Sequence, residues 1–230
     1  MIWPPGTPVT PAPAGDFEKI VARLLTGVPR RGRALVAIDG VGASGKSTFA
    51  AHLTHRIGTR PVTVLHVDDF FNPAVIRHAR GRQSAEGFWR DAYNYAALTD
   101  WALNPLRASG DGLYRPASYD RTSGETVQPA QVQASPDALV LVEGTFLHRD
   151  ELAPLWDYSM FLDVPFEETT RRMAQRDGLE PEHVLLNRYT GGQHIYFANA
   201  APWDRASLVV DNTDVNRPKI ISANAASPAP

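Results

Sequence analysis

The stretch that decides the fold runs from Gly40 to Thr48 and reads GVGASGKST. It fits the pattern G-x-x-x-x-G-K-[ST] and directly follows the apolar run 34–38, so we expect a strand, a loop and a helix in that order. Glycines let successive backbone N–H groups turn inward around a polyphosphate, and the helix adds its positive N-terminal end. The alternative is a glycine-rich surface loop that binds nothing.

This loop predicts a binding site for the phosphates of ATP. Lys46 would supply a point charge to the β- and γ-phosphates, and the Ser47 hydroxyl would ligate Mg²⁺. The sequence has no N-K-x-D tetrapeptide, which a guanine-binding GTPase would need. The predicted nucleotide contacts in the loop are Gly40, Gly42, Ala43, Ser44, Gly45, Lys46, Ser47 and Thr48.

On both sides of the loop, short apolar runs alternate with helical patterns. Most of these runs consist of Val, Leu and Ile without polar alternation, which is typical of strands buried on both faces of a parallel sheet. The alternation predicts a three-layer α/β fold. The predicted strands are 34–38, 62–67, 138–142, 159–164 and 206–210, and the predicted helices include 16–25, 46–57, 93–106 and 166–177.

Composition limits the class of protein. The chain has 230 residues, a formal net charge of −2 and no cysteine. These values argue against bulk DNA or membrane-surface binding, and they exclude disulfides and thiolate chemistry. No run reaches the ~18 apolar residues of a membrane span, so we expect a cytoplasmic location. We predict a flexible proline-rich arm that is not a signal peptide at 1–15, one domain at 16–218 and a flexible tail at 219–230.

Two carboxylates follow the second predicted strand, in the order Asp68, Asp69. In open α/β sheets the ligand lies outside the carboxyl ends of the strands, so Asp68 should lie beside the γ-phosphate. A carboxylate there can take a proton from an attacking hydroxyl and orient it for in-line transfer. The alternative is that either residue caps the next helical segment.

Glu143 ends an almost wholly apolar strand, where an unpaired carboxylate would be costly. A magnesium ion or its water shell would remove that cost. A salt bridge to an arginine would do so as well, and the chain is rich in arginine.

Arg172 and Arg176 lie four residues apart in a predicted helix and would project from one face. Two guanidinium groups so placed can bind phosphate oxygens and stabilise a transferring phosphoryl group. The alternative is a solvated helix in which both arginines pair with Glu167 and Glu168.

Several segments in order resemble the uridine kinase-like P-loop kinases, which include uridine-cytidine and nicotinamide riboside kinases and, more distantly, phosphoribulokinase and bacterial pantothenate kinase. The similarity covers about residues 34–218. Besides the loop, it rests on HVDDFFNP (66–73), YRPASYDRTSGE (114–125), LVLVEGTFLHRDELAPLWDYSMFLDVP (139–165), RRMAQRD (171–177), RYTGGQHIYF (188–197) and VVDNTD (209–214).

The resemblance implies a P-loop NTPase fold with a mostly parallel five-stranded sheet, an arginine-bearing lid helix, and Mg·ATP-dependent phosphorylation of a primary hydroxyl. By this resemblance, Asp68 looks like the catalytic base, and Arg172 and Arg176 look like lid residues over the phosphates, which together with Lys46 would neutralise the charge that develops during transfer. Ser47 and Glu143 look like the magnesium contacts. The loop Asp211, Asn212 and Thr213 is similar to one that flanks adenine, and the implied substrate contacts are Asp69, Phe71, Asn94, Tyr119 and Gln193.

The sequence departs from the family at two positions. Asn94 stands where the family usually has an aspartate that hydrogen-bonds the ribose hydroxyls. The alternative is that Asn94 is a helix N-terminal residue without a role in binding. Arg121 and the residues after it fill the stretch where the family has a base-contacting histidine.

The expected acceptor is a small molecule with a hydroxyl, first of all a nucleoside such as uridine or cytidine. Nicotinamide riboside, pantothenate and ribulose phosphate are alternatives, as is a regulator that binds ATP without transferring phosphate. The sequence leaves homo-oligomerisation open and assigns no role to His66, His148 and His194.

Overall fold

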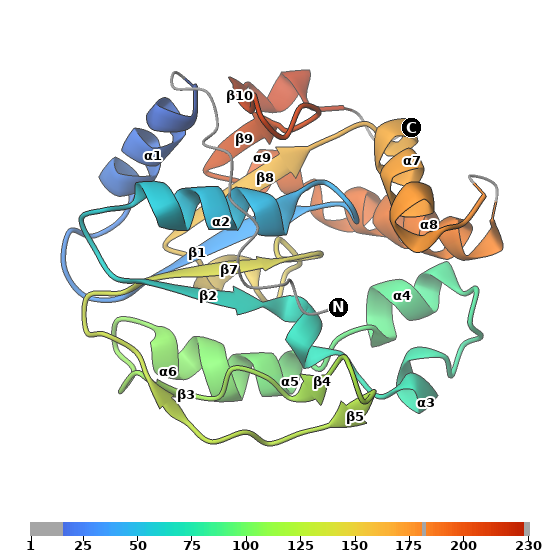
Figure 1. Cartoon of the computed structure of the whole chain (residues 1–230), viewed down its shortest axis with the longest axis horizontal. Coiled ribbons are helices and arrows are strands. Elements are labelled where there is room, and N and C mark those ends of the chain that lie inside the picture. The colour runs from blue at the N-terminus through green and yellow to red at the C-terminus, as the bar shows by residue number, and fades with distance from the viewer. Residues whose placement is uncertain (1–15, 181–182, 228–230) are drawn as a thin grey trace.

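A computed structural model describes residues 16–180 and 183–227 (Figure 1). Its centre is a six-stranded sheet in the order β10-β9-β8-β1-β7-β2, in which only β10 runs antiparallel to its neighbour. The strands are β1 (Ala34–Gly40), β2 (Val62–His66), β7 (Leu139–Gly144), β8 (Tyr158–Asp163), β9 (Leu208–Asp211) and β10 (Lys219–Ile221).

Three of the four inner strands are buried along their whole length because both of their faces are covered. Every residue of β1, β7 and β8 is buried, whereas the edge strand β2 is mostly half-buried. Successive side chains of β1 alternate between the faces: Val36 packs in one core cluster and Leu35 in the other. This explains the unbroken apolar runs in the sequence.

One face of the sheet is covered by α1 (Asp16–Gly27) and α2 (Lys46–Arg56), as Figure 1 shows. α1 buries Phe17, Ile20, Val21 and Leu24, which recur at helical spacing. α2 begins at the end of the glycine-rich loop, so the core positions the loop through both β1 and α2.

The opposite face carries the segments that connect β2 with β7 and β8 with β9 (Figure 1). The larger helices there are α4 (Ala85–Asp91), α8 (Val184–Ala200) and a run of α5 (Tyr95–Ala97), the π-helical turn η2 (Leu98–Leu103) and α6 (Asn104–Leu106). α7 (Phe166–Asp177) follows β8 and contacts α8.

Short elements complete the chain. The helical ones are η1 (Val67–Phe70), α3 (Ala74–Arg77), η3 (Ala153–Leu155), α9 (Pro202–Arg205) and η4 (Ala223–Ala225). Two small antiparallel pairs lie between α6 and β7, namely β3 (Leu113–Tyr114) with β6 (Val132–Gln133) and β4 (Tyr119–Asp120) with β5 (Glu125–Thr126).

The predicted α/β class and mostly parallel sheet are confirmed, and all the predicted strands form. The expected strand count was one too low. Lys219–Ile221, assigned to a flexible tail, pairs with β9 as an antiparallel edge, and Ser227 bonds the Asp163 carboxylate through its backbone N–H and its hydroxyl. A run of three residues is too short to give a strand pattern in the sequence. The predicted arm at 1–15 lies outside the described residues.

Candidate active site

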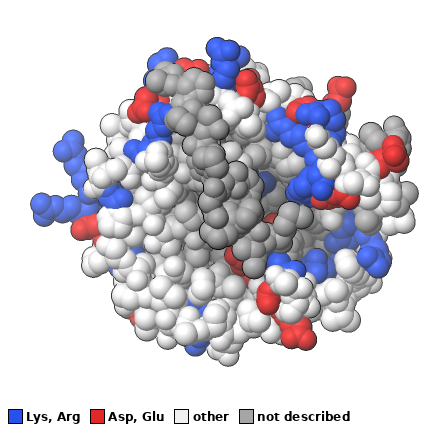
Figure 2. Space-filling model, in the orientation of Figure 1, with Lys and Arg blue, Asp and Glu red and all other residues white. Residues whose placement is uncertain are grey.

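A cleft of about 880 Å³ opens at the carboxyl ends of β1, β7 and β2, where ligands of open α/β sheets bind. In Figure 2, basic side chains gather on the right of the face shown, where Figure 1 places α7, α8 and α3. The lining residues are Gly42, Ala43, Gly45, Lys46, Ser47, Thr48, Asp68, Phe71, Phe88, Tyr93, Arg121, Glu143, Gly144, Thr145, Arg172, Met173, Arg176, Tyr189 and Gln193.

The glycine-rich loop has the form of a phosphate cradle. A methyl group at Gly40 would lie 2.6 Å from Ser44 Oγ, and one at Gly45 would lie 2.8 Å from Asn212 Nδ2. Gly45 also has a φ of +89°, a conformation that side chains disfavour. It begins α2 without a side-chain cap, so the first N–H groups of the helix are available to an anion in the cleft.

Lys46 is held in place by the loop itself. Its Nζ donates to Gly40 O at 3.1 Å and to Val41 O at 2.9 Å. Burial lowers the pKa of Lys46, and the carboxylates of Glu143 and Asp68 partly oppose that effect. The ammonium therefore lies among charges of both signs at the bottom of the cleft.

Glu143 meets Ser47 and a histidine that the sequence did not single out. Ser47 Oγ donates to Glu143 Oε1 at 2.9 Å, and His66 Nδ1 lies 2.6 Å from the same oxygen. The predicted alternative of an arginine partner is wrong, because among the described residues Glu143 forms its ion pair with His66. Burial alone would raise the pKa of Glu143, but the His66 hydrogen bond and the charge of Lys46 lower it overall. The parallel register places His66 beside Glu143 on β7.

Asp68 lies in η1 at the end of β2 and is one of the residues that line the cleft. Its Oδ1 accepts a hydrogen bond from the Tyr93 hydroxyl at 3.0 Å. Burial and the nearby Glu143 charge raise the pKa of Asp68, whereas Lys46 and the Tyr93 hydrogen bond oppose this rise. A carboxylate with a raised pKa beside a cradle can accept a proton near neutral pH. Neither Asp68 nor Asp69 caps η1, so that alternative is wrong.

Asp69 points to a different partner. Arg121, from the tip of the β4–β5 hairpin, brings Nε within 2.8 Å of Asp69 Oδ1. Burial raises the pKa of Asp69, and Arg121 opposes the rise. Arg121 lines the cleft, whereas Asp69 does not, so the predicted substrate contact of Asp69 stays a prediction.

Both arginines of the lid helix α7 line the cleft. Arg172 pairs with Glu168 at 2.7 Å and also donates to Ala43 O at 3.3 Å and Thr213 O at 2.6 Å. Arg176 pairs with its neighbour Asp177 at 2.7 Å. The alternative of a charge-paired helix is therefore correct for the Arg172–Glu168 contact, yet the same guanidinium also ties α7 to the cradle.

The loop after β9 supports the cradle from outside the cleft. Asn212 is buried, and its Nδ2 donates to Ser44 O at 2.7 Å. Asp211 Oδ1 accepts from the backbone N–H of Thr213 at 2.9 Å. Asp211, Asn212 and Thr213 do not line the cleft, and their predicted adenine contact stays a prediction.

The predicted substrate residues separate into two groups. Phe71 and Gln193 line the cleft. Gln193 is 2% exposed, and neither of its amide atoms has a hydrogen-bond partner among the residues that the structure describes. Asn94 instead caps α5, accepting from Ala97 N–H at 3.0 Å, and Tyr119 accepts from Arg77 Nη2 at 3.0 Å. Asn94 and Tyr119 do not line the cleft, so the helix N-terminal interpretation of Asn94 is the one that the structure supports.

Several residues of the site escaped sequence reasoning. Tyr189 lies in α8, where an aromatic residue is typical of a core position, and Tyr93 forms an isolated β-bridge with Phe71, on which its ring stacks with centroids 4.8 Å apart. His66 is the last residue of β2, and its place at the carboxyl end of a strand was a usable signal.

Among residues 16–180 and 183–227, no group of three or more His, Asp or Glu side chains could hold a metal by itself. Ser47 and Glu143 therefore offer a partial oxygen shell, of the kind that Mg²⁺ completes with phosphate and water.

In residues 16–180 and 183–227, no helix is long and apolar enough to cross a membrane.

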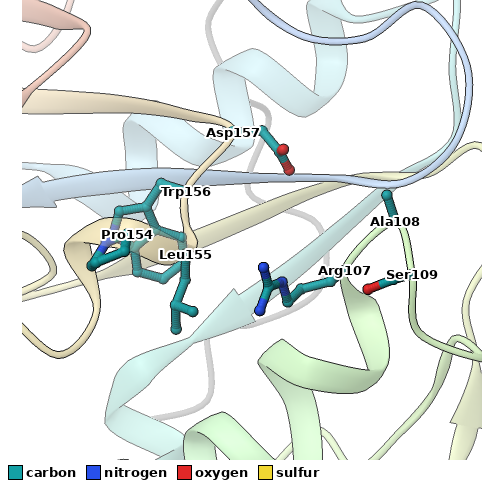
Figure 3. A pocket seen from close by; sticks show the side chains of 7 residues that line it. All are labelled: Arg107, Ala108, Ser109, Pro154, Leu155, Trp156 and Asp157. Atoms are coloured by element: carbon teal, nitrogen blue, oxygen red, sulfur yellow. The ribbon is translucent and has the colours of Figure 1, made fainter.

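A second hollow, of about 190 Å³, lies at the other end of the sheet (Figure 3). It is formed by Arg107, Ala108 and Ser109 and by residues 154–157 before β8. Its carboxylate, Asp157, already accepts from Leu35 N–H at 2.8 Å at the start of β1. This hollow is small and at the wrong end of the strands for phosphoryl transfer.

No family model matches the chain. A uridine kinase from Deinococcus deserti is 26% identical over 198 residues, which cover 81% of this chain and 91% of that protein. Nicotinamide riboside kinase 1 of Rattus norvegicus is 28% identical over 62% of this chain and 66% of its own length. A phosphoribulokinase from Synechocystis also matches, but the chain covers only 43% of it.

The fold agrees with these relatives. The solved structure described as a possible uridine kinase from Bacillus stearothermophilus has a TM-score of 0.67 at 24% identity, and the match covers 84% of this chain and 96% of that one. The resemblance to the uridine kinase-like P-loop kinases is thus confirmed in sequence and in fold, while identities of this size leave the acceptor open.

Proposed function

We propose that the protein is a Mg·ATP-dependent kinase that phosphorylates a hydroxyl of a small molecule, first of all a nucleoside such as uridine or cytidine. The observation that carries this is the joint presence of Lys46, Asp68 and Glu143 around one cleft, with a raised pKa at Asp68. The chain's lack of cysteine favours a cytoplasmic location.

In the proposed reaction, Asp68 takes the proton of the acceptor hydroxyl and orients its oxygen toward the γ-phosphorus. The new oxygen–phosphorus bond forms as the bond from that phosphorus to the β,γ-bridging oxygen breaks, and ADP leaves with the electron pair. Lys46, Arg172 and Arg176 stabilise the charge on the phosphoryl oxygens. Tyr93 keeps the Asp68 carboxylate in one orientation.

The residues present fit a magnesium ion held between ATP and the chain. The Ser47 hydroxyl and the Glu143 carboxylate lie 2.9 Å apart at the cradle, and both are oxygen donors. When bound there, the ion would neutralise phosphate charge and supply Lewis-acid assistance.

The acceptor end of the cleft favours a planar, partly apolar molecule. Its walls are the rings of Phe71, Phe88, Tyr93 and Tyr189, and the polar groups among them include the free amide of Gln193. An amide can pair with the carbonyl and N–H edge of a nucleobase or with the carboxamide of nicotinamide riboside. Residue 94 is an asparagine and so has no carboxylate for a ribose, and its side chain is used to cap α5. For that reason the test includes acceptors that are not ribosides.

A phosphate-transfer screen tests the proposal. Radiolabelled ATP and Mg²⁺ are incubated with uridine, cytidine, nicotinamide riboside, pantothenate or ribulose 5-phosphate, and with no acceptor. We expect transfer to at least one nucleoside, and a loss of about 10²–10⁴-fold in the Asp68→Asn variant, which removes the general base. Wild-type turnover by Asp68→Asn would refute its role as base.

The rival function is a regulator that binds ATP without transferring phosphate. The half-buried, tyrosine-bonded Asp68 argues against it, because ATP binding alone needs no carboxylate with a raised pKa. Tight ATP binding with no transfer to any acceptor, and with no ADP formed, would favour the regulator.

A further inference from the structure

A carboxylate just below the phosphate cradle is fully buried and takes no part in the proposed chemistry. Asp39 is 0% exposed and is followed directly by Gly40. Its Oδ1 accepts from Gly40 N–H at 2.7 Å. Its Oδ2 accepts from His148 N–H at 3.1 Å, from the Tyr196 hydroxyl, and from His148 Nδ1 at 2.7 Å.

This network joins three elements that each contribute to the cleft. Asp39 is the penultimate residue of β1, His148 follows the β7 segment that carries Glu143, and Tyr196 lies on α8. The carbonyl of Gly40, the residue whose N–H bonds Asp39, accepts a hydrogen bond from Lys46 Nζ at 3.1 Å. A single carboxylate therefore connects the root of the cradle with a helix on the opposite face of the sheet.

On α8, Tyr189, Gln193 and Tyr196 are spaced by four and three residues, so they lie on one face of the helix. The first two line the cleft, and Tyr196 is 0% exposed and reaches Asp39. The anchored residue is thus one turn away from the free amide of Gln193.

We propose that the Tyr196–Asp39 hydrogen bond is a positioning contact that holds the acceptor-side face of α8 in register with the phosphate cradle. The inference rests on the proposed function, which assigns one side of the cleft to ATP and the other side to the acceptor. Neither residue lines the cleft, so both act through Gln193 and Gly40. A buried polar network of this kind can fix orientation without adding stability, because apolar residues would fill the same space at no desolvation cost.

The first experiment needs no ligand. Amide hydrogen exchange is compared between wild type and Tyr196→Phe, with Tyr158→Phe as the matched control. Tyr158 is an 8% exposed tyrosine of β8 that packs against the α1 and α2 side of the sheet. We expect Tyr196→Phe to speed exchange about 2–10-fold, which is the factor that corresponds to the loss of one net hydrogen bond. The faster exchange should be seen in peptides covering 184–200 and also in peptides covering 40–48. A change confined to 184–200 would overturn the inference.

The second experiment adds Mg²⁺ and the non-hydrolysable analogue AMP-PNP. In wild type and in Tyr158→Phe, the analogue should protect 40–48 directly and 184–200 through the network. In Tyr196→Phe, protection of 40–48 should persist and protection of 184–200 should fall about 2–10-fold. Equal protection of 184–200 in all three proteins would refute the coupling and leave the kinase proposal intact.

The two proposals fail in different ways. If AMP-PNP protects 40–48 in no protein, the proposed function fails, and the ligand-free comparison still decides the positioning role. If Tyr196→Phe does not fold, Asp39→Asn provides the same comparison, because the amide keeps the shape of the carboxylate and loses acceptor capacity. With any acceptor that the screen identifies, Tyr196→Phe should raise the acceptor KM more than the ATP KM.

Discussion

The two halves of the cleft are built in opposite ways. On the nucleotide side, several polar groups already have partners in the chain: Lys46 bonds loop carbonyls, Ser47 bonds Glu143, and Asn212 bonds the backbone of Ser44. On the acceptor side, the amide of Gln193 has no hydrogen-bond partner among the described residues, and Arg121 reaches Asp69 through a partly exposed ion pair.

This difference shows how each half obtains its specificity. The cradle is one continuous stretch whose geometry follows from its own backbone, so it is preorganised for a common ligand. The acceptor wall takes residues from η1, α4, α8 and the β4–β5 hairpin, and within the described residues the amide of its Gln193 is left to pair with a bound molecule. Substitutions should therefore have the largest effects on the nucleotide side, and their effects on the acceptor side should appear in KM.

Among the substitutions that compare the two halves, the largest effect is expected from Lys46→Ala. The variant loses the compact positive charge at the cradle, which should weaken Mg·ATP binding and lower transfer about 10²–10³-fold, as loss of one transition-state donor does elsewhere. Calorimetry with AMP-PNP gives the affinity, and Lys19→Ala, a change at an exposed lysine of α1, is the control. Unchanged nucleotide affinity in Lys46→Ala would contradict the assignment of the cradle.

Gln193→Ala tests the acceptor half. Losing an amide that pairs with the acceptor should raise the acceptor KM about 10-fold, equal to one or two net hydrogen bonds, with little change in the ATP KM. Steady-state kinetics with the best acceptor of the screen measures both constants. Gln175→Ala, at an exposed position of α7, is the control. An equal rise in both constants would mean that Gln193 does not belong to the acceptor half.

Tyr93→Phe should shift the pH profile. Asp68 must be ionised to accept a proton, and burial raises its pKa, so activity falls as the pH drops through that raised value. The Tyr93 hydrogen bond lowers the pKa, so its loss raises the pKa of Asp68 further. The acid limb of kcat/KM then moves to higher pH, with a loss of only several-fold near neutrality. The profile of Tyr114→Phe, outside the cleft, should match that of wild type.

Asn94→Asp should have the smallest effect. Aspartate caps helices as well as asparagine does, so stability should change by less than about 0.5 kcal/mol. Because residue 94 caps α5 and does not line the cleft, the acceptor KM should stay within about twofold of the wild-type value. Thermal unfolding and kinetics check both values. A marked gain in riboside affinity would show that residue 94 reaches the acceptor after all.

Local patterns made much of the fold predictable. β1, β7 and β8 are buried on both faces and therefore read as unbroken apolar runs. α1 shows its buried face at helical spacing. β10 was missed because its three residues gain their order from pairing with β9, which a local pattern does not contain.

The site residues that could be predicted from the sequence belong to the contiguous cradle or lie at the end of a strand. Lys46, Ser47, Asp68 and Glu143 satisfy one of these conditions, and all four line the cleft. His66 and Tyr93 acquire their significance only from partners 77 and 25 residues away. Asn94 shows the opposite error, since its place in a family pattern suggested a ligand while its side chain caps a helix.

The sequence by itself determined the phosphate cradle and the layering of the sheet, because both depend on neighbouring residues and on a short period of apolar side chains. Only the tertiary structure decided which groups face each other across the cleft. It turned Arg121 toward Asp69, left the amide of Gln193 free, and joined Asp39 to Tyr196 across 157 positions. Hydrogen bonds and ion pairs act over a few ångströms, and chain distance does not set which side chains come that close.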